Sequence, residues 1–444
     1  MIPRASTVVL AVVGILLVGC VDPISSPEFS PAEIKEQVLS DPQLINGHLL
    51  GETSLTTVAG KDDPDEIRII IRLFEPNEGI GDGFLRRHGF LRRHGFLRRH
   101  SSSGQLTELS AAVQFDKKEI QKFFNLSDEE DTVMPALQHL LNQSEVAEIE
   151  PDLRVQAESV TMTPASSNQT VPWGVPHIGA PLAGLTADQL SSVQLYVLDT
   201  RVNEEDVHLV EELEFVNKTG KDEFTHGYHI AGTAGALDND TGVLGVAPGV
   251  SVHNMVVLNK FGMTSTSVVI DALNRIIERK EANPGTPMIV SASFGAYIGV
   301  TWKTALDRAF TDAADAGVVV VVSAGNDGLN ANRVTPAHAR GVITVGSHGP
   351  SNGHSSFSNF GPKVDIYAPG EDILSLGKIS KRKIVLLLGS GTSFAVPHAA
   401  GALASVLARD PGLTAEQALQ AISSPEGCVE GVPGNTTTKC VHLR

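Results

Sequence analysis

The pattern of apolar and polar positions changes near residue 171, and the chain after this point predicts an α/β domain. Short β-branched runs alternate there with longer segments of helical spacing. The runs lie at 193–198, 252–258, 288–291, 318–322 and 342–345, and the helical segments at 267–280, 302–316 and 394–408. Alternating strands and helices predict a doubly wound, mostly parallel sheet with helices on both faces. The all-valine run 318–322 is typical of a strand buried on both faces.

A smaller α+β unit is predicted before this point, between residues 66 and 156. Apolar runs at 66–74, 106–115 and 146–155 favour strands, and 117–124 and 133–141 have helical spacing. We interpret this combination of strands and helices as a small α+β, ferredoxin-like domain. Residues 21–65 have no strong period and are interpreted as a leader, and residues 157–170, rich in Ser, Thr, Gln and Asn, as a linker.

A perfect hexapeptide repeat interrupts the smaller unit. Gly-Phe-Leu-Arg-Arg-His occurs three times in residues 83–100. Three short copies are too few for a solenoid, so we expect a duplication in a surface loop. A protease-sensitive dibasic segment is the alternative, although basic runs are usually solvated faces.

The N-terminus predicts export. The first four residues form a short basic segment, and residues 8–18 are apolar apart from Gly14. This run is too short to span a bilayer comfortably and is typical of a secretion signal. We therefore expect a signal peptide at residues 1–20 and a secreted protein. The sequence Leu-Val-Gly-Cys ending at Cys20 also resembles a bacterial lipobox, so a lipid anchor through Cys20 is the alternative.

Charge and cysteine content agree with export and exclude one class of function. The net charge is −17 over 444 residues, whereas nucleic-acid binding needs a concentrated basic face. If Cys20 is removed or lipidated, Cys428 and Cys440 remain and suit one small disulfide loop, the alternative being two unrelated thiols. Glycosylation sequons, used only if the host glycosylates, begin at Asn125, Asn142, Asn168, Asn217, Asn239 and Asn435.

Four polar residues occupy positions that suit acyl transfer. Asp199 directly follows the run 193–198 and Asn326 follows 318–322, so both belong at carboxyl ends of strands, where α/β sheets place their sites. Ser393 begins a helical segment, where free N–H groups favour developing negative charge. His226 opens the sequence His-Gly-Tyr-His. Together they supply an acid, a base, a nucleophile and an amide donor.

The order Asp, His, Asn, Ser and the surrounding residues resemble the subtilisin-like serine peptidases, nearest to the proteinase K branch. The matching words are 225–233, 355–361, 368–370 and 389–398, and the resemblance covers about 173–422. Residues 66–156 resemble the family's inhibitory propeptide. The resemblance implies a catalytic domain at 171–425, a maturation site within 157–170 and a C-terminal tail at 426–444.

The resemblance also implies roles for individual residues. It implies Ser393, His226 and Asp199 as the catalytic triad of an endopeptidase made as a self-processed zymogen, and Asn326 as the oxyanion donor. Small residues in the substrate pocket imply broad specificity with an apolar bias. The residues implied for the walls of that pocket are Ser293, Phe294, Gly295, Ala324 and Gly325.

Expected partners follow from the same resemblance. They are protein or peptide substrates and the chain's own propeptide as an intramolecular inhibitor. The enzyme is expected to be a monomer, and the net charge argues against nucleic acid as a partner. The chemistry requires no cofactor. Structural calcium stays open, although a site that the proteinase K branch builds with an aspartate would here meet the uncharged Asn352.

Departures from the family motivate a second function. Arg201 replaces a glycine, Phe394 replaces a methionine, and Thr225 and Tyr228 add bulk beside His226. A catalytically weak homologue that retains its propeptide and acts as a binding or inhibitory protein is therefore the alternative.

Two other site types are rejected. His226 and His229 do not suggest zinc, because no glutamate accompanies them and Gly227 disfavours a helix. An α/β-hydrolase is discounted because that fold needs Gly-x-Ser-x-Gly, with the serine first in the chain.

Overall fold

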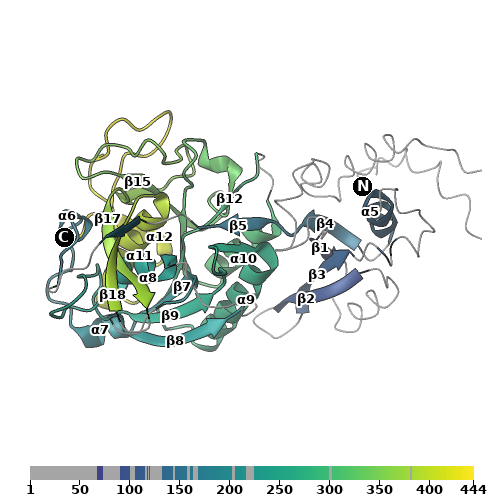
Figure 1. Cartoon of the computed structure of the whole chain (residues 1–444), viewed down its shortest axis with the longest axis horizontal. Helices are drawn as coiled ribbons and strands as arrows, with labels where there is room; N and C mark the ends of the chain where they lie inside the picture. The colour runs from purple at the N-terminus through teal and green to yellow at the C-terminus, as the bar shows by residue number, and fades with distance from the viewer. Residues whose placement is uncertain are drawn as a thin grey trace, which may run out of the picture.

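The computed structural model shows a small N-terminal domain beside a larger one (Figure 1). It describes residues 68–73, 91–100, 106–115, 118, 120, 133–143, 146–157, 161–163, 169–202, 206–216, 225–299, 303–380 and 383–444. The expected signal peptide, the leader and the sequons at Asn125, Asn168 and Asn217 lie outside these residues, as does most of the helix expected at 117–124. Among the described residues, no helix has the length and apolar character to cross a membrane.

Seven strands form the central sheet of the larger domain. Every neighbouring pair is parallel, and the all-valine strand is fully buried, as its sequence predicts. The fold class predicted from the sequence is therefore confirmed. In spatial order the strands are β16 (Ile366–Pro369), β15 (Ile343–His348), β13 (Val319–Ser323), β11 (Met288–Ala292), β7 (Gln194–Asp199), β9 (Ser251–Val256) and β8 (Leu209–Glu214).

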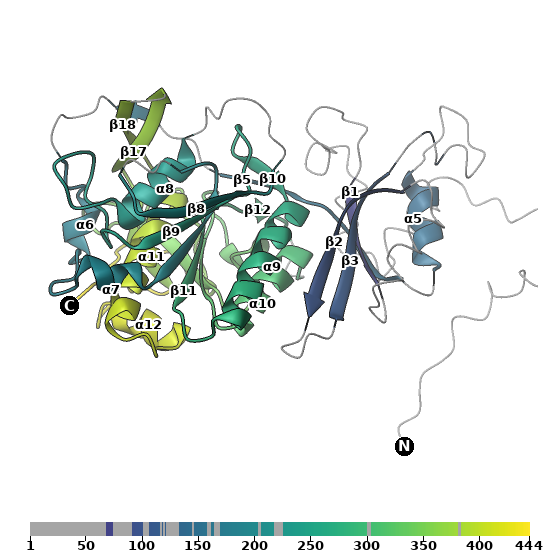
Figure 2. The same ribbon diagram turned by 90° about the horizontal axis from the view of Figure 1, so that it is seen from below.

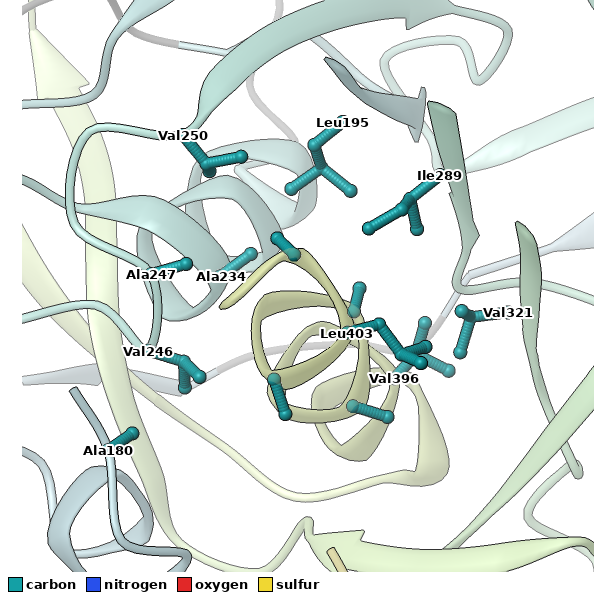
Figure 3. Packing of buried hydrophobic residues seen from close by; sticks show 14 of the residues in the cluster. Ala180, Leu195, Ala234, Val246, Ala247, Val250, Ile289, Val321, Val396 and Leu403 are labelled. Carbon is teal, nitrogen blue, oxygen red and sulfur yellow. The ribbon is translucent and has the colours of Figure 1, made fainter. Parts of the chain in front are cut away.

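Helices cover both faces of this sheet (Figure 2). One face carries α8 (His226–Gly235), α11 (Thr392–Arg409) and α12 (Ala415–Ile422), and the other carries α9 (Thr266–Ala282) and α10 (Ala305–Asp315). Figure 3 shows Val396 and Leu403 of α11 in one apolar cluster with Leu195, Ile289 and Val321 of three strands. Burial of these side chains stabilises the packing of α11 on the sheet.

Shorter elements surround this core. A hairpin of β17 (Ile373–Ser380) and β18 (Lys383–Gly389) leads into α11. The C-terminal residues 426–444 also pack on the domain, because Tyr367 pairs with Cys440 and Cys440 forms a disulfide with Cys428. The remaining short elements are α6 (Gly174–His177), α7 (Ala187–Ser191), β10 (Met263–Ser265), β12 (Ala296–Tyr297), the 3₁₀ turn η2 (Ala331–Arg333) and β14 (Val334–Thr335).

The N-terminal domain has a four-stranded antiparallel sheet in the order β2 (Leu91–His100), β3 (Leu106–Phe115), β1 (Arg68–Leu73), β4 (Val146–Pro151), together with α5 (Val133–Leu141). The expected surface loop is wrong for the described part of the hexapeptide repeat, residues 91–100, which form the edge strand β2. The free edge of β3 offers backbone partners, and the Phe-Leu pairs of the repeat favour strand structure.

Candidate active site

Asp199 and His226 form a fully buried pair at the carboxyl end of a central strand. Asp199 ends β7 and His226 begins α8. The Nδ1 atom of His226 lies 2.9 Å from Asp199 Oδ1 and 2.8 Å from Oδ2. An ionised carboxylate can only accept, so Nδ1 carries the proton and donates it. Asp199 Oδ1 also accepts from the backbone N–H of Thr200 at 2.7 Å.

Gly227 was expected to disfavour a helix here, but it lies in α8. The glycine is needed for close packing, which helix propensity does not include. A Cβ at Gly227 would lie 2.5 Å from the carbonyl oxygen of Thr200. The Gly227 N–H instead donates to Thr200 Oγ1 at 2.9 Å. His226 and His229 therefore share α8, but their rings have different partners, since His229 Nε2 donates to the carbonyl of Ile373 at 2.9 Å.

Ser393 lies in the first turn of α11, where a proline changes the hydrogen bonding. Pro397 has no N–H, so the Ser393 carbonyl four residues earlier receives no helical hydrogen bond. The Ser293 hydroxyl donates to that carbonyl at 2.9 Å. The Ser393 hydroxyl in turn donates to the Ser293 carbonyl, also at 2.9 Å. This reciprocal pair holds Ser393 against the chain that leaves β11.

The His226 ring lies beside the same turn. Its centroid is 5.5 Å from that of Phe394, the residue after Ser393. Phe394 also packs against His229 with centroids 4.5 Å apart. Burial lowers the pKa of His229 to about 3, so this ring is neutral at physiological pH and acts as a packing contact. The Asp199–His226 pair thus lies beside the first turn of α11, the turn that carries Ser393.

Asn326 follows β13 and faces the start of α11. Its Oδ1 accepts from the backbone N–H of Thr392 at 2.7 Å, so its Nδ2 is the group oriented to donate elsewhere. Asn359, which the sequence analysis did not single out, braces this loop. Its Nδ2 donates to the carbonyl of Ala324 at 2.9 Å, and its Oδ1 accepts from two backbone N–H groups further along the loop. Asn359 lies within the motif 355–361, but the spacing of that motif does not show that its side chain is buried against the loop after β13.

The residues expected to line the substrate pocket take different places. Phe294 is only 1 % exposed and packs in the core against Phe310, so its side chain does not form an open wall. Ser293 holds Ser393, as described above. Ala324 is buried, and the Gly325 N–H donates to Thr392 Oγ1 at 3.2 Å. Gly295 presents its backbone to a neighbouring strand.

That neighbouring strand is the end of the N-terminal domain. β5 (Arg154–Gln156) pairs antiparallel with β10. On its other side, Gln156 exchanges backbone hydrogen bonds of 3.3 and 3.4 Å with Gly295. The Ala157 N–H donates to the carbonyl of Gly262 at 2.9 Å. Val155 and Ala157 are buried, whereas Gln156 is exposed. Strand addition of this kind is a general way to bind an extended peptide.

The next described residues of the linker pair with the strand that precedes Ser393. Residues 158–160 lie outside the described residues, and β6 (Thr161–Thr163) then pairs antiparallel with β18, with Thr161 opposite Leu388. β18 ends at Gly389, just before the turn that leads to Ser393. The described residues within 154–163 therefore have backbone partners both in the segment that follows β11 and in the strand that leads into α11.

Two acidic residues of the N-terminal domain cap helices of the larger domain. Glu150 accepts from the N–H of Ala305, the first residue of α10, at 2.7 and 2.9 Å and pairs with Arg308 at 3.2 Å. Asp152 accepts from the N–H and the hydroxyl of Ser267 in α9 at 2.9 and 2.7 Å. Carboxylates satisfy free N–H groups at helix N-termini and complement the helix dipole. Burial nevertheless raises the pKa of Glu150 to about 7, although Arg308 opposes this change.

Comparison with known proteins identifies the family. The model of the Subtilase family (Peptidase_S8) matches residues 144–426, more than half of the chain. The chain belongs to the subtilase family. Subtilisin DY of Bacillus licheniformis is 34 % identical to this subtilase over 263 residues, 58 % of this chain and 91 % of that relative. Subtilisin-like protease 5 of Arthroderma benhamiae is 31 % identical over 324 residues, 71 % and 76 % of the two chains.

A solved structure agrees with this assignment. A cold adapted subtilisin-like serine proteinase matches with a TM-score of 0.52 and 31 % identity, covering 63 % of this chain and all but 1 % of its own. The family resemblance and the subtilisin-like fold predicted from the sequence are confirmed, and the enzyme is a serine protease.

The residues that depart from the usual subtilase pattern leave the Asp199–His226 contact in place. Arg201 pairs with Glu212 and Glu214 of the edge strand β8. Glu212 also accepts from the Val202 N–H at 3.1 Å. Arg201 therefore ties the segment after Asp199 to the edge of the sheet.

Oxygen-bearing groups converge at a second place, which could hold calcium. Asp206 is fully buried; its Oδ1 accepts from Asn239 Nδ2 at 2.7 Å, and its Oδ2 makes no hydrogen bond within the described part of the chain. The Gln169 amide donates to the carbonyls of Leu237 and Val243 at 2.8 and 3.4 Å. One carboxylate, two amide groups and two carbonyls are the kinds of ligand that Ca²⁺ prefers. Binding would require both amides, which here donate through nitrogen, to present their oxygen atoms instead.

Other metal types find less support. Among the described residues, no three His, Cys, Asp or Glu side chains are grouped to hold a metal ion. Asn352, the position weighed for calcium in the sequence analysis, has its Oδ1 2.7 Å from His177 Nε2, so this amide joins two parts of the protein.

Proposed function

We propose that this subtilase is a secreted endopeptidase that cleaves peptide bonds with Ser393, His226 and Asp199, and that its precursor first cuts its own linker. The observation that carries the proposal is the path of the chain through the site. β5 and Ala157 pair with β10, Gly262 and Gly295, and β6 pairs with β18, the strand that leads into α11 and Ser393. The only chain between them is 158–160, so we place the self-cleavage there.

The geometry supports an ordered proton transfer. Asp199 accepts the Nδ1 proton of His226, which fixes the tautomer and leaves Nε2 as the base. The Ser393 hydroxyl has one proton, which it now donates to the Ser293 carbonyl. In the attack this proton passes to His226 Nε2 as the Ser393 oxygen bonds to the peptide carbonyl carbon. The imidazolium then protonates the leaving amine, and water hydrolyses the acyl-enzyme by the reverse transfers.

Two donors suit the oxyanion that forms in this step. The backbone N–H of Ser393 lies in the first turn of α11, where N–H groups have no intrahelical acceptor. Asn326 Nδ2 is the second donor, because Thr392 fixes the other end of its amide. Removing the corresponding donor from subtilisin costs about 10²–10³ in turnover, a magnitude taken from that enzyme.

The contacts of the linker also support a substrate preference. Val155 and Ala157 are buried in the same apolar cluster as Phe294 and Val269, whereas Gln156 is exposed. We therefore expect small or aliphatic side chains at the two inward positions and little selection at the outward one. This refines the apolar bias expected from the sequence.

The N-terminal domain serves as an intramolecular inhibitor in this proposal. Its last strand pairs with β10 and exchanges hydrogen bonds with Gly295, and Glu150 and Asp152 fasten the domain to α10 and α9. The expected signal peptide at residues 1–20 would deliver the precursor outside the cell. A structural calcium ion held by Asp206, Asn239 and Gln169 would stabilise the loop that carries Leu237 and Val243.

Self-cleavage is tested by expressing the full chain as wild type, Ser393→Ala and Ser405→Ala. Ser405 is a buried serine on the same helix, so it is the matched control. Wild type and Ser405→Ala should release a large fragment whose N-terminus falls at 159–161, and Ser393→Ala should stay full length. Equal processing of Ser393→Ala in a protease-free system would refute the proposal. Wild type that neither processes nor reacts with a fluorophosphonate would favour the inhibitory homologue.

A further inference from the structure

A series of hydrogen bonds joins Trp173 to the turn before Ser393. Trp173 Nε1 donates to the carbonyls of Glu371 and Asp372 at 3.1 and 3.2 Å. The Asp372 N–H donates to Ser390 Oγ at 2.9 Å, and the Gly391 N–H donates to the Gly370 carbonyl at 2.8 Å. Gly391 is the N-cap of α11. The series therefore ends two residues before the nucleophile proposed above.

The loop 370–372 has little freedom to absorb a displacement. Asp372 has a φ of 51°, a left-handed conformation that costs energy for a residue other than glycine. A Cβ at Gly370 would lie 2.3 Å from Ser347 Oγ and 2.8 Å from the Gly391 carbonyl oxygen. Because the backbones touch, a shift of the loop must shift Gly391.

Trp173 is itself held in place. Its ring packs edge-on against His177 and His348 at centroid distances of 5.2 and 6.2 Å. His177 Nε2 is hydrogen-bonded to Asn352 Oδ1 at 2.7 Å, which fixes α6 to the loop after β15. The tryptophan also contacts the main apolar cluster. The indole is thus a fixed point from which the loop is held.

We infer that Trp173 is a positioning residue for catalysis: its indole N–H holds the loop 370–372, and this loop holds the first turn of α11. The inference rests on the proposal that Ser393 is the nucleophile. The Ser393 hydroxyl and N–H both depend on the position of that turn. The peptide-binding contacts of β10 and Gly295 lie elsewhere, so loss of the indole N–H should lower kcat and leave KM nearly unchanged.

The first test is Trp173→Phe, measured on the processed enzyme with a peptide substrate. Phenylalanine keeps an aromatic ring and removes the donor. We expect kcat to fall about fivefold, the effect of one hydrogen bond, with KM changed less than about twofold. Val175→Ala is the matched control. Val175 is buried in α6, the helix whose N-cap is Trp173, and its backbone hydrogen bonds go to Pro172 and Ala180 rather than to the loop 370–372. It should lower the melting temperature and leave kcat unchanged.

A second variant tests the loop from its other side and does not depend on the folding of the first. Ser390→Ala removes the acceptor of the Asp372 N–H and should also lower kcat about fivefold. The double variant should be little worse than either single variant, because both release the same loop. Additive losses, about 25-fold together, would overturn the inference, as would a Trp173→Phe enzyme with wild-type kcat.

Fluorophosphonate labelling of the processed enzyme separates this inference from the one beneath it. If wild type is not labelled at Ser393, the nucleophile assignment is wrong. If wild type is labelled and Trp173→Phe is labelled at the same rate, the assignment stands and the positioning role is wrong.

Discussion

Removal of the Ser293 hydroxyl should destabilise the enzyme through the carbonyl of Ser393. Pro397 has already removed the helical donor to this carbonyl, and the Ser293 hydroxyl replaces it at 2.9 Å. Both serines are buried, at 0 % and 2 % exposure, so water does not readily take over the hydrogen bond. A buried acceptor left unsatisfied costs about 2 kcal/mol. In a domain of this size, Ser293→Ala should lower the melting temperature by about 4–8 °C.

The same reasoning predicts a rescue. Pro397→Ala restores an N–H that can donate to the Ser393 carbonyl, since the two residues are four apart in α11. In that background the Ser293 hydroxyl is a second donor to a carbonyl that already has one. Ser293→Ala should then cost about 0.5 kcal/mol, which gives a coupling of about 1.5 kcal/mol between the two substitutions.

The assay is thermal unfolding followed by circular dichroism, with every variant made in the Ser393→Ala background to prevent self-digestion. Ser405→Ala is the control, because its hydroxyl donates to the Gly401 carbonyl within an unbroken part of the helix at 3.1 Å. Its melting temperature should change by less than about 2 °C, for about 0.5 kcal/mol. An equal loss from Ser293→Ala with and without Pro397 would refute the assignment of this hydrogen bond.

Three further predictions concern ions and pH. Chelation of calcium should remove up to about 2.7 kcal/mol of stability if the ion was present at a hundredfold excess over its Kd, and the melting temperature should fall accordingly. The melting temperature of Asp206→Asn should be the same with and without chelator. A fall as large as that of wild type in this variant would exclude the site. Burial raises the pKa of Glu150 from 4.5 to about 7 in the precursor. Ionisation of this buried carboxyl therefore destabilises the docked N-terminal domain, so its contribution to stability is fully present below about pH 4.5 and is lost as the pH rises through 7. Activity should therefore appear faster after processing at pH 8 than at pH 5, and Glu150→Gln, which keeps the acceptor, should remove most of this difference; the same pH dependence in both proteins would contradict it. Burial alone would lower the pKa of His338, but the hydrogen bond and charge of Asp307 outweigh it and raise the pKa above 6.5. The pair then stabilises the fold below pH 6.5 and loses this effect as the pH rises through the raised pKa, so His338→Gln should flatten the fall in melting temperature between pH 6 and 9; a fall as steep as in wild type would count against the pair.

The sequence predicted those parts of the fold in which one apolar pattern determines one element. α5 and β3 have the predicted bounds, and the valine run forms the buried strand β13. β8 was missed because its sequence, Leu-Val-Glu-Glu-Leu-Glu, is dominated by charge. The structure explains those charges, since Glu211 pairs with Arg279 and Glu212 and Glu214 pair with Arg201. Ion pairs at a sheet edge leave no apolar alternation to detect.

α8 was missed for a different reason. Helix propensity includes the entropic cost of Gly227 but not the close packing of α8 against Thr200. A Cβ at this position would lie 2.5 Å from the carbonyl oxygen of Thr200, so only glycine fits. The prediction for the hexapeptide repeat was wrong for a similar reason, since it did not include a tertiary contact. The three short copies suggested a duplication in a surface loop, but residues 91–100 pair with the backbone of β3 as an edge strand.

The candidate site residues could be proposed from the sequence because their chemistry is local to strand ends and a helix start, whereas the contacts that position them are not. Ser293 and Ser393 are a hundred positions apart, and only the missing N–H of Pro397 gives a reason for their pairing. Asn326 is oriented by a backbone N–H of another element, and that element is held in turn through Gly391 by a loop far along the chain. A motif can therefore name the reacting groups, but their relative position depends on hydrogen bonds between segments that the motif does not connect. Substitutions that remove these connecting hydrogen bonds should therefore change turnover even though every proposed catalytic residue is intact.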